Sequence, residues 1–563
     1  MNKEMNRKKV LAAAVLFIFF ILFAKLLFIQ IVMYGKINKT VENMVKRESV
    51  ETAKRGDILD SSGSVLASSV LRYTLFLDPK MITDFDYDKK ILASYGIKIK
   101  EKNLQAFGDT SYAPAAFELD GELVKKIKTE KMPGVGFESK YSREYPEGRL
   151  LVHILGITGS DGNGLEGIEK VCNAYLSGEN VKTTQYKDGR GQVISDTLVD
   201  KSKINGLGVT LTIDKNIQFI AEQELRKAFA DYKAKRAICI VQNPNDGNIL
   251  AMVSLPDFDF TGRITDPSLL RNSAVSDVFE PGSTFKIVAA AAALEEKKIK
   301  PGDSFYLEDG KMKIGKFIVK DDHKMYGSAS LSKIMEQSSN IGMVKVAQKL
   351  GNKLFYEYIR KFGFYALTGV DLPGEAKGLL LDEKNWNTMT LPTASFGQGV
   401  AVTALQLTNA FSAVANGGVL MKPIIIKSIE NTLPQDMSFF EPKEIRRVIS
   451  GDTAEQIKKL LRNAVEKGTG KSGKVPGYTT GGKTGTAQKI DSDTKKYSTK
   501  HYIASFCGML PMSKPELVIF VMIDEPKGDY YAASVAAPVF SRIAARTAEY
   551  LNIPKDEGTT GNK

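Results

Sequence analysis

The 563-residue sequence has few of the residues that build disulfide frameworks, zinc sites and histidine-based triads. Its three cysteines are far apart and odd in number, so neither a disulfide framework nor a zinc site is expected. Only three histidines are present, so a triad that depends on histidine is poorly supplied. Lysine and arginine form no compact cluster despite a net charge of +13, so no nucleic-acid-binding module is expected. The positive charge fits a solvated surface or contact with a polyanionic cell surface.

Only one hydrophobic run, residues 10–33, is long enough to cross a membrane. As a helix these 24 residues would span ~36 Å, and the hydrocarbon core of a bilayer is ~30 Å thick. Basic residues dominate the preceding segment 1–9, which predicts a cytoplasmic tail and places everything after about Tyr34 on the outer side. A cleaved signal peptide is the alternative, but no small residues mark a cleavage site. We therefore interpret residues 10–33 as an uncleaved transmembrane signal anchor.

The chain is too long for one ordinary domain, because ~150 residues per domain predicts about three or four units. Residues 34–205 begin with a polar, helix-compatible stalk and continue with mixed strand and helix signals, including a predicted hairpin in residues 55–67. A new unit starts near Val209, and we assign residues 206–551 to it. The polar segment 552–563 is predicted to be a disordered tail.

The pattern in residues 206–551 predicts an α+β fold, with an antiparallel sheet packed between helices. A strand at 209–213 leads into a helix that Asp214 caps. The turn at 243–247 lies between two apolar runs and predicts a hairpin. Further helices are predicted around 283–296, 330–351, 403–416 and 535–551, and a second hairpin from strands at 482–490 and 516–524.

Three short motifs in this unit carry residues suited to nucleophilic catalysis. In the first, Ser283-Thr-Phe-Lys286, the turn before Ser283 places it at a helix N-terminus, and residues three apart share a helix face, so the lysine amine is expected to reach the serine hydroxyl. The second is Ser338-Ser-Asn340, and the third is Lys483-Thr-Gly-Thr486 on an edge strand where a substrate backbone could lie. Each motif alone is weak, but the three in this order form a specific signal.

With these motifs, the sequence resembles the class B penicillin-binding proteins, the peptidoglycan D,D-transpeptidases. The block Arg55-Gly-Asp-Ile-Leu-Asp60 is similar to the start of that family's pedestal, and Phe279-Glu-Pro-Gly-Ser-Thr-Phe-Lys286 resembles the division-specific FtsI-type branch. The resemblance covers roughly residues 10–550. It implies a single transmembrane helix, an elongated pedestal (dimerisation-type) domain in 34–205, and a penicillin-recognising serine transpeptidase domain in 206–551.

The resemblance also implies a role for each motif residue. Ser283 would be the acylated nucleophile and Lys286 its base, with a pKa lowered by burial and by the nearby cation Lys483. Ser338 would relay a proton to the leaving D-alanine, and Asn340 would orient Lys286. Lys483 and its neighbours Thr484, Gly485 and Thr486 would bind the substrate, and the N–H groups of Ser283 and Thr486 would form the oxyanion hole. No metal or organic cofactor is required.

The expected partners also follow from the resemblance. They are peptidoglycan stem peptides, the lipid-linked precursor polymer, β-lactams as covalent inhibitors, and division proteins that include a membrane glycosyltransferase polymerase. The expected location is the inner membrane, with the catalytic domain outside the cytoplasm. An elongation-type transpeptidase, a D,D-carboxypeptidase, a β-lactamase and a non-catalytic division scaffold or β-lactam sensor remain alternatives. His323 and His501 are assigned no role.

Overall fold

The structure is a computed structural model that describes residues 2–99, 112–187, 193–196, 200, 204–260, 262, 264, 266–322, 325–430, 438–491, 494 and 496–557. His323 and residues 558–563 of the predicted tail lie outside the described residues. The chain forms two compact units: residues 1–54 with 178–205, and residues 55–177 with 206–563. The second unit contains residues from both sides of position 205, where the sequence predicts a domain boundary. The boundary at 205 stays a prediction.

The first unit consists of an N-terminal helix and a small sheet. Helix α1 (Asn2–Leu27) continues through a π-helical turn (Phe28–Val32), and within it Lys3–Val32 is long and apolar enough to cross a membrane. Helix α2 (Tyr34–Val45) follows, and β1 (Lys46–Glu51) then pairs antiparallel with β6 (Val181–Lys187), which pairs with β7 (Val193–Asp196). The predicted helical stalk is therefore a helix only as far as Val45.

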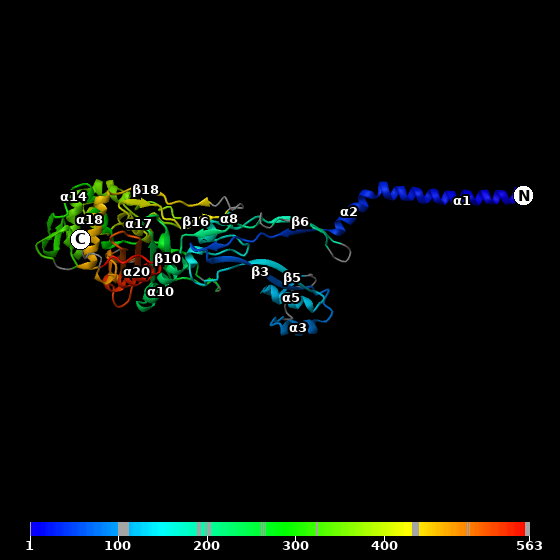
Figure 1. Ribbon diagram of the computed structural model, residues 1–563, viewed down its shortest axis with the longest axis horizontal. Helices are drawn as coiled ribbons and strands as arrows, with labels where there is room; N and C mark the ends of the chain where they lie inside the picture. The colour runs from blue at the N-terminus through cyan, green and yellow to red at the C-terminus, as the bar shows by residue number, and fades with distance from the viewer. Residues whose placement is uncertain are drawn as a thin grey trace. The chain divides into compact units, whose positions relative to one another are not determined.

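The second unit begins with a sheet built around a long strand. Strand β3 (Val65–Leu77) pairs antiparallel with β2 (Ile58–Leu59), β4 (Ala113–Leu119) and β5 (Val135–Glu144). The pairing of β2 with β3 gives the hairpin predicted in residues 55–67. Figure 1 shows α3 (Phe85–Ser94) and α5 (Gly121–Thr129) beside β3 and β5, and Asp84 and Asp120 cap the two helices.

A five-stranded antiparallel sheet in the order β10-β9-β21-β20-β19 positions the candidate site. Its central strand β21 (Leu517–Asp524) is buried along its whole length, as its continuous apolar run predicts. One face packs against the core that contains α12 (Lys286–Glu295) and α17 (Ala404–Ala415). The other face packs against α10 (Lys215–Asp231) and α20 (Ala537–Tyr550), which lie side by side (Figure 1).

The structure corrects the predicted pairing of the last strands. The hairpin predicted from residues 482–490 and 516–524 is wrong, because β20 (Tyr497–Leu510) lies between β19 (Gly481–Ile490) and β21 and pairs with both. Serine, alanine and glycine interrupt the apolar run of β20, so its sequence does not stand out as a strand. By contrast, β9 (Arg236–Gln242) and β10 (Ile249–Leu255) form the predicted hairpin.

The remaining elements complete the second unit. Three short helices follow β5, and β8 (Val209–Leu211) joins the β2–β3 sheet through β2 and β16. Residues 552–557 of the predicted tail are held against the rest of the unit, with Asp556 accepting a hydrogen bond from the Thr479 N–H. The other bounds are α6 (Val152–Leu155), α7 (Gly167–Val171), α8 (Asn173–Leu176), α11 (Ser273–Ser276), β11 (Ser304–Tyr306), β12 (Lys311–Ile314), β13 (Phe317–Lys320), β14 (Ser328–Ser330), α13 (Leu331–Gln337), α14 (Asn340–Leu350), α15 (Asn352–Lys361), α16 (Thr390–Ser395), β15 (Val419–Met421), β16 (Ile426–Ile429), β17 (Ser438–Phe439), β18 (Glu444–Arg447), α18 (Gly451–Glu466) and α19 (Ala532–Val535).

Candidate functional site

Ser283 lies in a tight turn directly before a buried helix. The turn is a 3₁₀ helix (Gly282–Phe285), and α12 begins at Lys286, so the helix predicted from residue 283 starts as a 3₁₀ turn. Gly282 has a φ of +54°, a left-handed conformation that glycine adopts without strain. Ser283 is partly exposed, whereas its neighbours Thr284 and Phe285 are buried. The turn therefore presents the serine to the surface on a rigid base.

The Lys286 amine is fully buried and makes its hydrogen bonds to the second motif. Nζ donates to the Ser338 carbonyl oxygen at 2.6 Å, to Ser338 Oγ at 3.2 Å and to Asn340 Oδ1 at 2.8 Å. The predicted contact with the Ser283 hydroxyl is not among the hydrogen bonds of the described residues. The i, i+3 spacing therefore places Lys286 on the helix face expected from the sequence, but the hydrogen bonds that hold its amine come from residues over fifty positions away.

Ser338 lies at a break between two helices, in a region where the sequence predicts a single helix. Helix α13 ends at Gln337, Ser338 is left-handed with a φ of +59°, and α14 begins at Asn340. A non-glycine residue in this conformation is strained by about 1–3 kcal/mol, and such residues are common at functional sites. The break turns Ser338 and Asn340 toward the two lysines of the other motifs.

Lys483 approaches the same serine from the edge strand β19. Its Nζ donates to Ser338 Oγ at 2.9 Å, and its side chain is fully buried. Thr484 contacts the hydroxyl of Thr469 at 2.9 Å, and the Thr486 hydroxyl accepts a hydrogen bond from the Ala532 N–H at 3.1 Å. The three motifs, spread over about 200 residues, thus meet around the hydroxyl of Ser338.

Burial changes the protonation of both lysines. Loss of solvent lowers the pKa of Lys286 to about 7, although the carboxylates of Asp321 and Asp322 oppose the decrease. The pKa of Lys483 is lowered well below its ordinary value, by burial and by the positive charge of Lys286. Because two buried cations at one hydroxyl repel each other, the site favours the loss of a proton from the pair.

Gly485 allows β19 to approach the turn that carries Ser283. A Cβ atom at this position would lie 2.8 Å from the Pro281 carbonyl oxygen and 2.7 Å from Ser505 Oγ. Any side chain here would push the strand away from the Gly282–Phe285 turn. The glycine of the third motif therefore sets the distance between the serine and the edge strand.

The motif residues line a cleft of about 360 Å³ that is open to solvent. Ser283, Asn340 and Thr486 face this cleft, together with Tyr502 and Tyr530 from the sheet side. A smaller cavity of about 70 Å³ adjoins Ser283 and is lined by Ser338 and Thr484. The hydroxyl groups of these residues thus surround the space next to the partly exposed Ser283.

Asp321 supports the second motif, although no sequence pattern pointed to this residue. One carboxylate oxygen accepts hydrogen bonds from the Asn340 and Ile341 N–H groups, and the other accepts one from the Ser339 hydroxyl at 2.7 Å. The aspartate therefore caps α14 from outside the helix. Its separation from the motif, eighteen residues to Ser339, left no local sequence signal.

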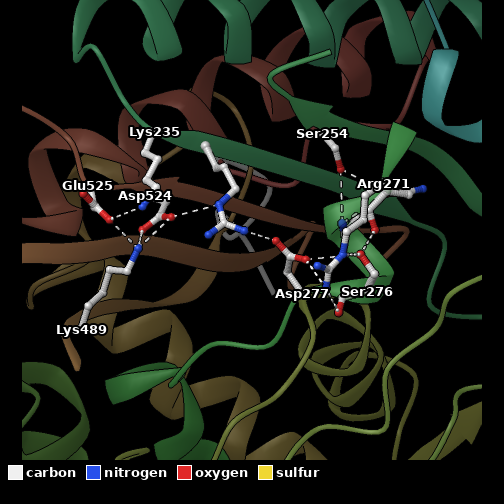
Figure 2. Close-up of polar contacts among 11 residues, drawn as sticks. Lys235, Ser254, Arg271, Ser276, Asp277, Lys489, Asp524 and Glu525 are labelled. Carbon is white, nitrogen blue, oxygen red and sulfur yellow. Dashed lines mark hydrogen bonds and ion pairs between the residues drawn. The ribbon is translucent and has the colours of Figure 1, made fainter. Parts of the chain in front are cut away.

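Figure 2 shows a row of alternating charges that runs from Lys489 and Asp524 to Asp277 and Arg271. Lys489 donates to Asp524 at 2.8 Å, and Arg236 pairs with both Asp524 and Asp277. Asp277 also pairs with Arg271 at 2.8 Å. These ion pairs fix the segment 277–280, which leads directly to Ser283, against the ends of β9, β21 and β19.

A larger cavity of about 640 Å³ is lined in part by this row of charges. Its walls are mostly apolar and include Phe279, Leu380 and Ile503. Gln488 lines both this cavity and the cleft of Ser283. Gln488 on β19 therefore lies at the border of both spaces.

The described histidines and the cysteines lie outside the cleft. His501 Nδ1 is 2.9 Å from a Glu525 oxygen, and the three cysteines are free and buried. Among the residues that the structure describes, no cluster of three histidine, cysteine or acidic side chains could hold a metal ion.

Comparison with known proteins gives two family matches. The model described as "Penicillin binding protein transpeptidase domain" matches residues 237–545, which hold all three motifs. The model described as "Penicillin-binding Protein dimerisation domain" matches residues 50–211.

Whole-length relatives share the same organisation. Stage V sporulation protein D of Bacillus subtilis is 35% identical over 95% of this chain and 84% of that protein. The probable peptidoglycan D,D-transpeptidase PenA of Neisseria meningitidis is 31% identical over 96% of this chain and 92% of that protein. The crystal structure of penicillin-binding protein 3 of Mycobacterium tuberculosis with aztreonam has a TM-score of 0.71 at 28% identity, covering 90% of this chain and 98% of that one.

Proposed function

This chain belongs to the penicillin-binding protein family, as its motifs predicted, and we propose that it is a peptidoglycan D,D-transpeptidase that works in division and is inhibited by β-lactams. The observation that carries the proposal is the convergence of Lys286 and Lys483 on Ser338 beside the partly exposed Ser283. The sequence relatives named as transpeptidases support the reaction, and the family's recognition of penicillin supports the inhibitor.

Acylation would begin with Ser283. A neutral Lys286 takes the proton from the Ser283 hydroxyl as its oxygen attacks the penultimate D-alanyl carbonyl of a stem peptide. The N–H groups of Ser283 and Thr486 would stabilise the oxyanion. As the carbon–nitrogen bond breaks, Ser338 relays a proton to the amine of the departing D-alanine. The lowered pKa of Lys286 supports its role as base, because an ordinary lysine stays protonated at neutral pH.

Substrate binding would involve the third motif. Lys483 lies next to hydroxyl-bearing residues, and we assign it, Thr484 and Thr486 to the terminal carboxylate of the donor peptide. Gly485 keeps the strand close to the serine, and Asn340 orients Lys286 through their 2.8 Å hydrogen bond. A second peptide then attacks the ester with its amine, which forms the crosslink and frees Ser283.

The direct test is covalent labelling with a fluorescent penicillin. The wild-type chain is expected to be labelled, and Ser283→Ala to remain unlabelled. Ser94→Ala provides a matched control, because Ser94 is exposed at the end of α3 and does not line the cleft. Labelling of Ser283→Ala at the wild-type level would rule out Ser283 as the nucleophile. A separate assay of crosslinked dimer against released D-alanine distinguishes transpeptidase from carboxypeptidase and β-lactamase.

The finer setting of the activity is also a proposal. Helix α1 supports anchoring to the inner membrane, with the N-terminus in the cytoplasm and the catalytic domain outside. The division role implies division proteins as partners, including a membrane glycosyltransferase. The likeness to a protein named for sporulation favours a second setting, the wall of a developing spore. Localisation of a tagged chain separates the two: septal enrichment in growing cells supports division, and a signal confined to the forespore supports sporulation.

A further inference from the structure

The hairpin formed by β12 and β13 carries an unusual concentration of positive charge. Residues 311–320 contain four lysines and no acid, and all four side chains are exposed. No ion pair of any of the four is present among the described residues. The four are Lys311, Lys313, Lys316 and Lys320.

The strand register places like charges directly opposite each other. Lys311 is paired with Lys320, and Lys313 is paired with Ile318. Like charges at facing positions destabilise a two-stranded sheet, and no opposite charge on the hairpin offsets this. A local arrangement that costs stability without a compensating contact is expected at a functional surface.

The hairpin has one face in the core and one face in solvent. Val319 is buried against Ile341 and Val344, and Met312 and Ile314 pack on the same cluster. The alternation of strand residues therefore places Lys311, Lys313 and Lys320 on the outward face. Ile318 is 59% exposed on that face, so the face offers an apolar side chain among three cations.

This face borders the catalytic cleft. Ile318 and Lys320 line the cleft, and the Lys320 carbonyl oxygen accepts a hydrogen bond from Asn340 Nδ2 at 3.0 Å. The hairpin belongs to a different sheet from β19. The cleft therefore has one wall from the strand assigned to the donor peptide and a second wall from the edge of the β12–β13 hairpin, where Lys320 is the lysine that lines it.

We propose that the outward face of the β12–β13 hairpin binds the acceptor stem peptide through its carboxylates. This inference rests on the proposed function, because transpeptidation requires a second peptide at Ser283 after the first has been bound along β19. Stem peptides with a free C-terminus carry negative charge, and three cations beside an exposed isoleucine match an acidic peptide. Asp322 and Asn340 also line the cleft.

The test uses the full chain in detergent, acylated by a D-alanyl-D-alanine donor peptide. The acyl-enzyme partitions between hydrolysis and transfer to a stem tetrapeptide with a free side-chain amine, prepared in lysine and diaminopimelate forms. The variant Lys311→Gln/Lys313→Gln/Lys320→Gln is expected to raise the acceptor concentration for half-maximal transfer about tenfold, given the usual strength of exposed ion pairs. The limiting rate of transfer is expected to stay the same, because the lysines do not touch the reacting atoms.

Two controls separate charge recognition from loss of structure. Lys297→Gln/Lys298→Gln/Lys300→Gln removes three exposed lysines that line none of the cavities described above, and it is expected to keep wild-type acceptor use. The hairpin variant is expected to unfold at no lower temperature than the wild type, because it relieves the repulsion between Lys311 and Lys320. An acceptor whose carboxylates are amidated is expected to bind both wild type and hairpin variant equally weakly.

The proposal is overturned if the hairpin variant reaches half-maximal transfer at the same concentration of acidic acceptor as the wild type. It is overturned as well if the triple substitution weakens the use of the amidated acceptor as much as it weakens the use of the acidic one. It is also overturned if the lysines govern binding to anionic phospholipid vesicles but not acceptor use, since the face would then contact a membrane. A wild-type chain that forms no acyl-enzyme contradicts the proposed function. Normal acylation with lysine-independent acceptor use contradicts only this inference.

Discussion

At the scale of single residues, two buried amines share one hydroxyl. Lys286 and Lys483 both donate to Ser338 Oγ, at 3.2 and 2.9 Å, and both lose their solvent shell. In water each amine would be charged, but burying two cations together is costly. Burial lowers the pKa of Lys286 to about 7, so at neutral pH a substantial fraction of Lys286 is in the neutral form that can accept the proton of Ser283.

The pH dependence of acylation follows from the lowered pKa of Lys286. The protonated amine cannot act as a base, so the acylation rate is expected to rise with pH and to reach half its maximum near the pKa of about 7. The measurement is the second-order rate of penicillin acylation between about pH 5 and about pH 9. Lys286→Arg is the control and should be inactive throughout, because arginine stays charged. A flat wild-type profile across this range would contradict the assignment of Lys286 as base.

At the scale of elements, the break between α13 and α14 organises the second motif. Ser338 closes one helix in a left-handed conformation, and Ser339 caps the next through the Gly342 N–H. Asp321, at the end of the β13 segment, binds the first N–H groups of α14. The position of Asn340, and through it Lys286, therefore depends on contacts between three elements.

Removing the Asp321 side chain is expected to loosen this junction. Asp321→Ala leaves the Asn340 and Ile341 N–H groups without their acceptor and should cost about 1–2 kcal/mol of stability, typical of a lost helix cap. Asp321→Asn can still accept hydrogen bonds and should recover most of that stability. Thermal unfolding of both variants checks this, and equal losses in the two would contradict the capping role.

The charge of Asp321 gives the same substitution a second, independent effect. The carboxylate raises the pKa of Lys286, so its removal in Asp321→Asn should lower that pKa further. The rise of the acylation rate should then occur at lower pH than in the wild type. An unchanged pH profile with unchanged stability would show that Asp321 affects neither the base nor the helix.

At the scale of the whole molecule, a buried ion-pair network joins three segments of the second unit. Glu169 on α7 is fully buried and lies 2.6 Å from Arg55 and 2.7 Å from Arg143 on β5. Arg55 also donates to the Glu169 carbonyl oxygen and to Asn173. One carboxylate thus holds the chain before β2, strand β5 and helix α7 together.

Neutralising Glu169 is expected to destabilise this unit strongly. Glu169→Gln leaves two buried guanidinium groups without their anion, and breaking such a pair typically costs about 3–5 kcal/mol. Thermal unfolding of the full chain measures the change. Glu122→Gln is the matched control, because Glu122 forms an exposed pair with Lys125 and should leave the unfolding temperature unchanged. Equal unfolding temperatures for wild type and Glu169→Gln would show that the network contributes little.

The sequence by itself determined the family, the reaction class and the residues of the three motifs. Motif order, the apolar run long enough to span a membrane and the apolar strand at 517–524 are local signals, and each can be recognised without knowing what lies beside it. The helices at 283–296 and 403–416 and the hairpin at 237–254 could be predicted for the same reason. Strand β20 was missed because its small residues hide its pattern.

Only the tertiary structure decided how these residues meet. It placed the Lys286 amine on Ser338 and Asn340, assigned the capping of α14 to Asp321, and set Lys311 opposite Lys320. Each of these contacts either joins segments that are distant in the chain or depends on strand register. A short window of sequence encodes neither a long-range contact nor a strand register. Burial decides the pKa of Lys286 in the same way, because solvent is excluded by the whole fold and not by its neighbours in the chain.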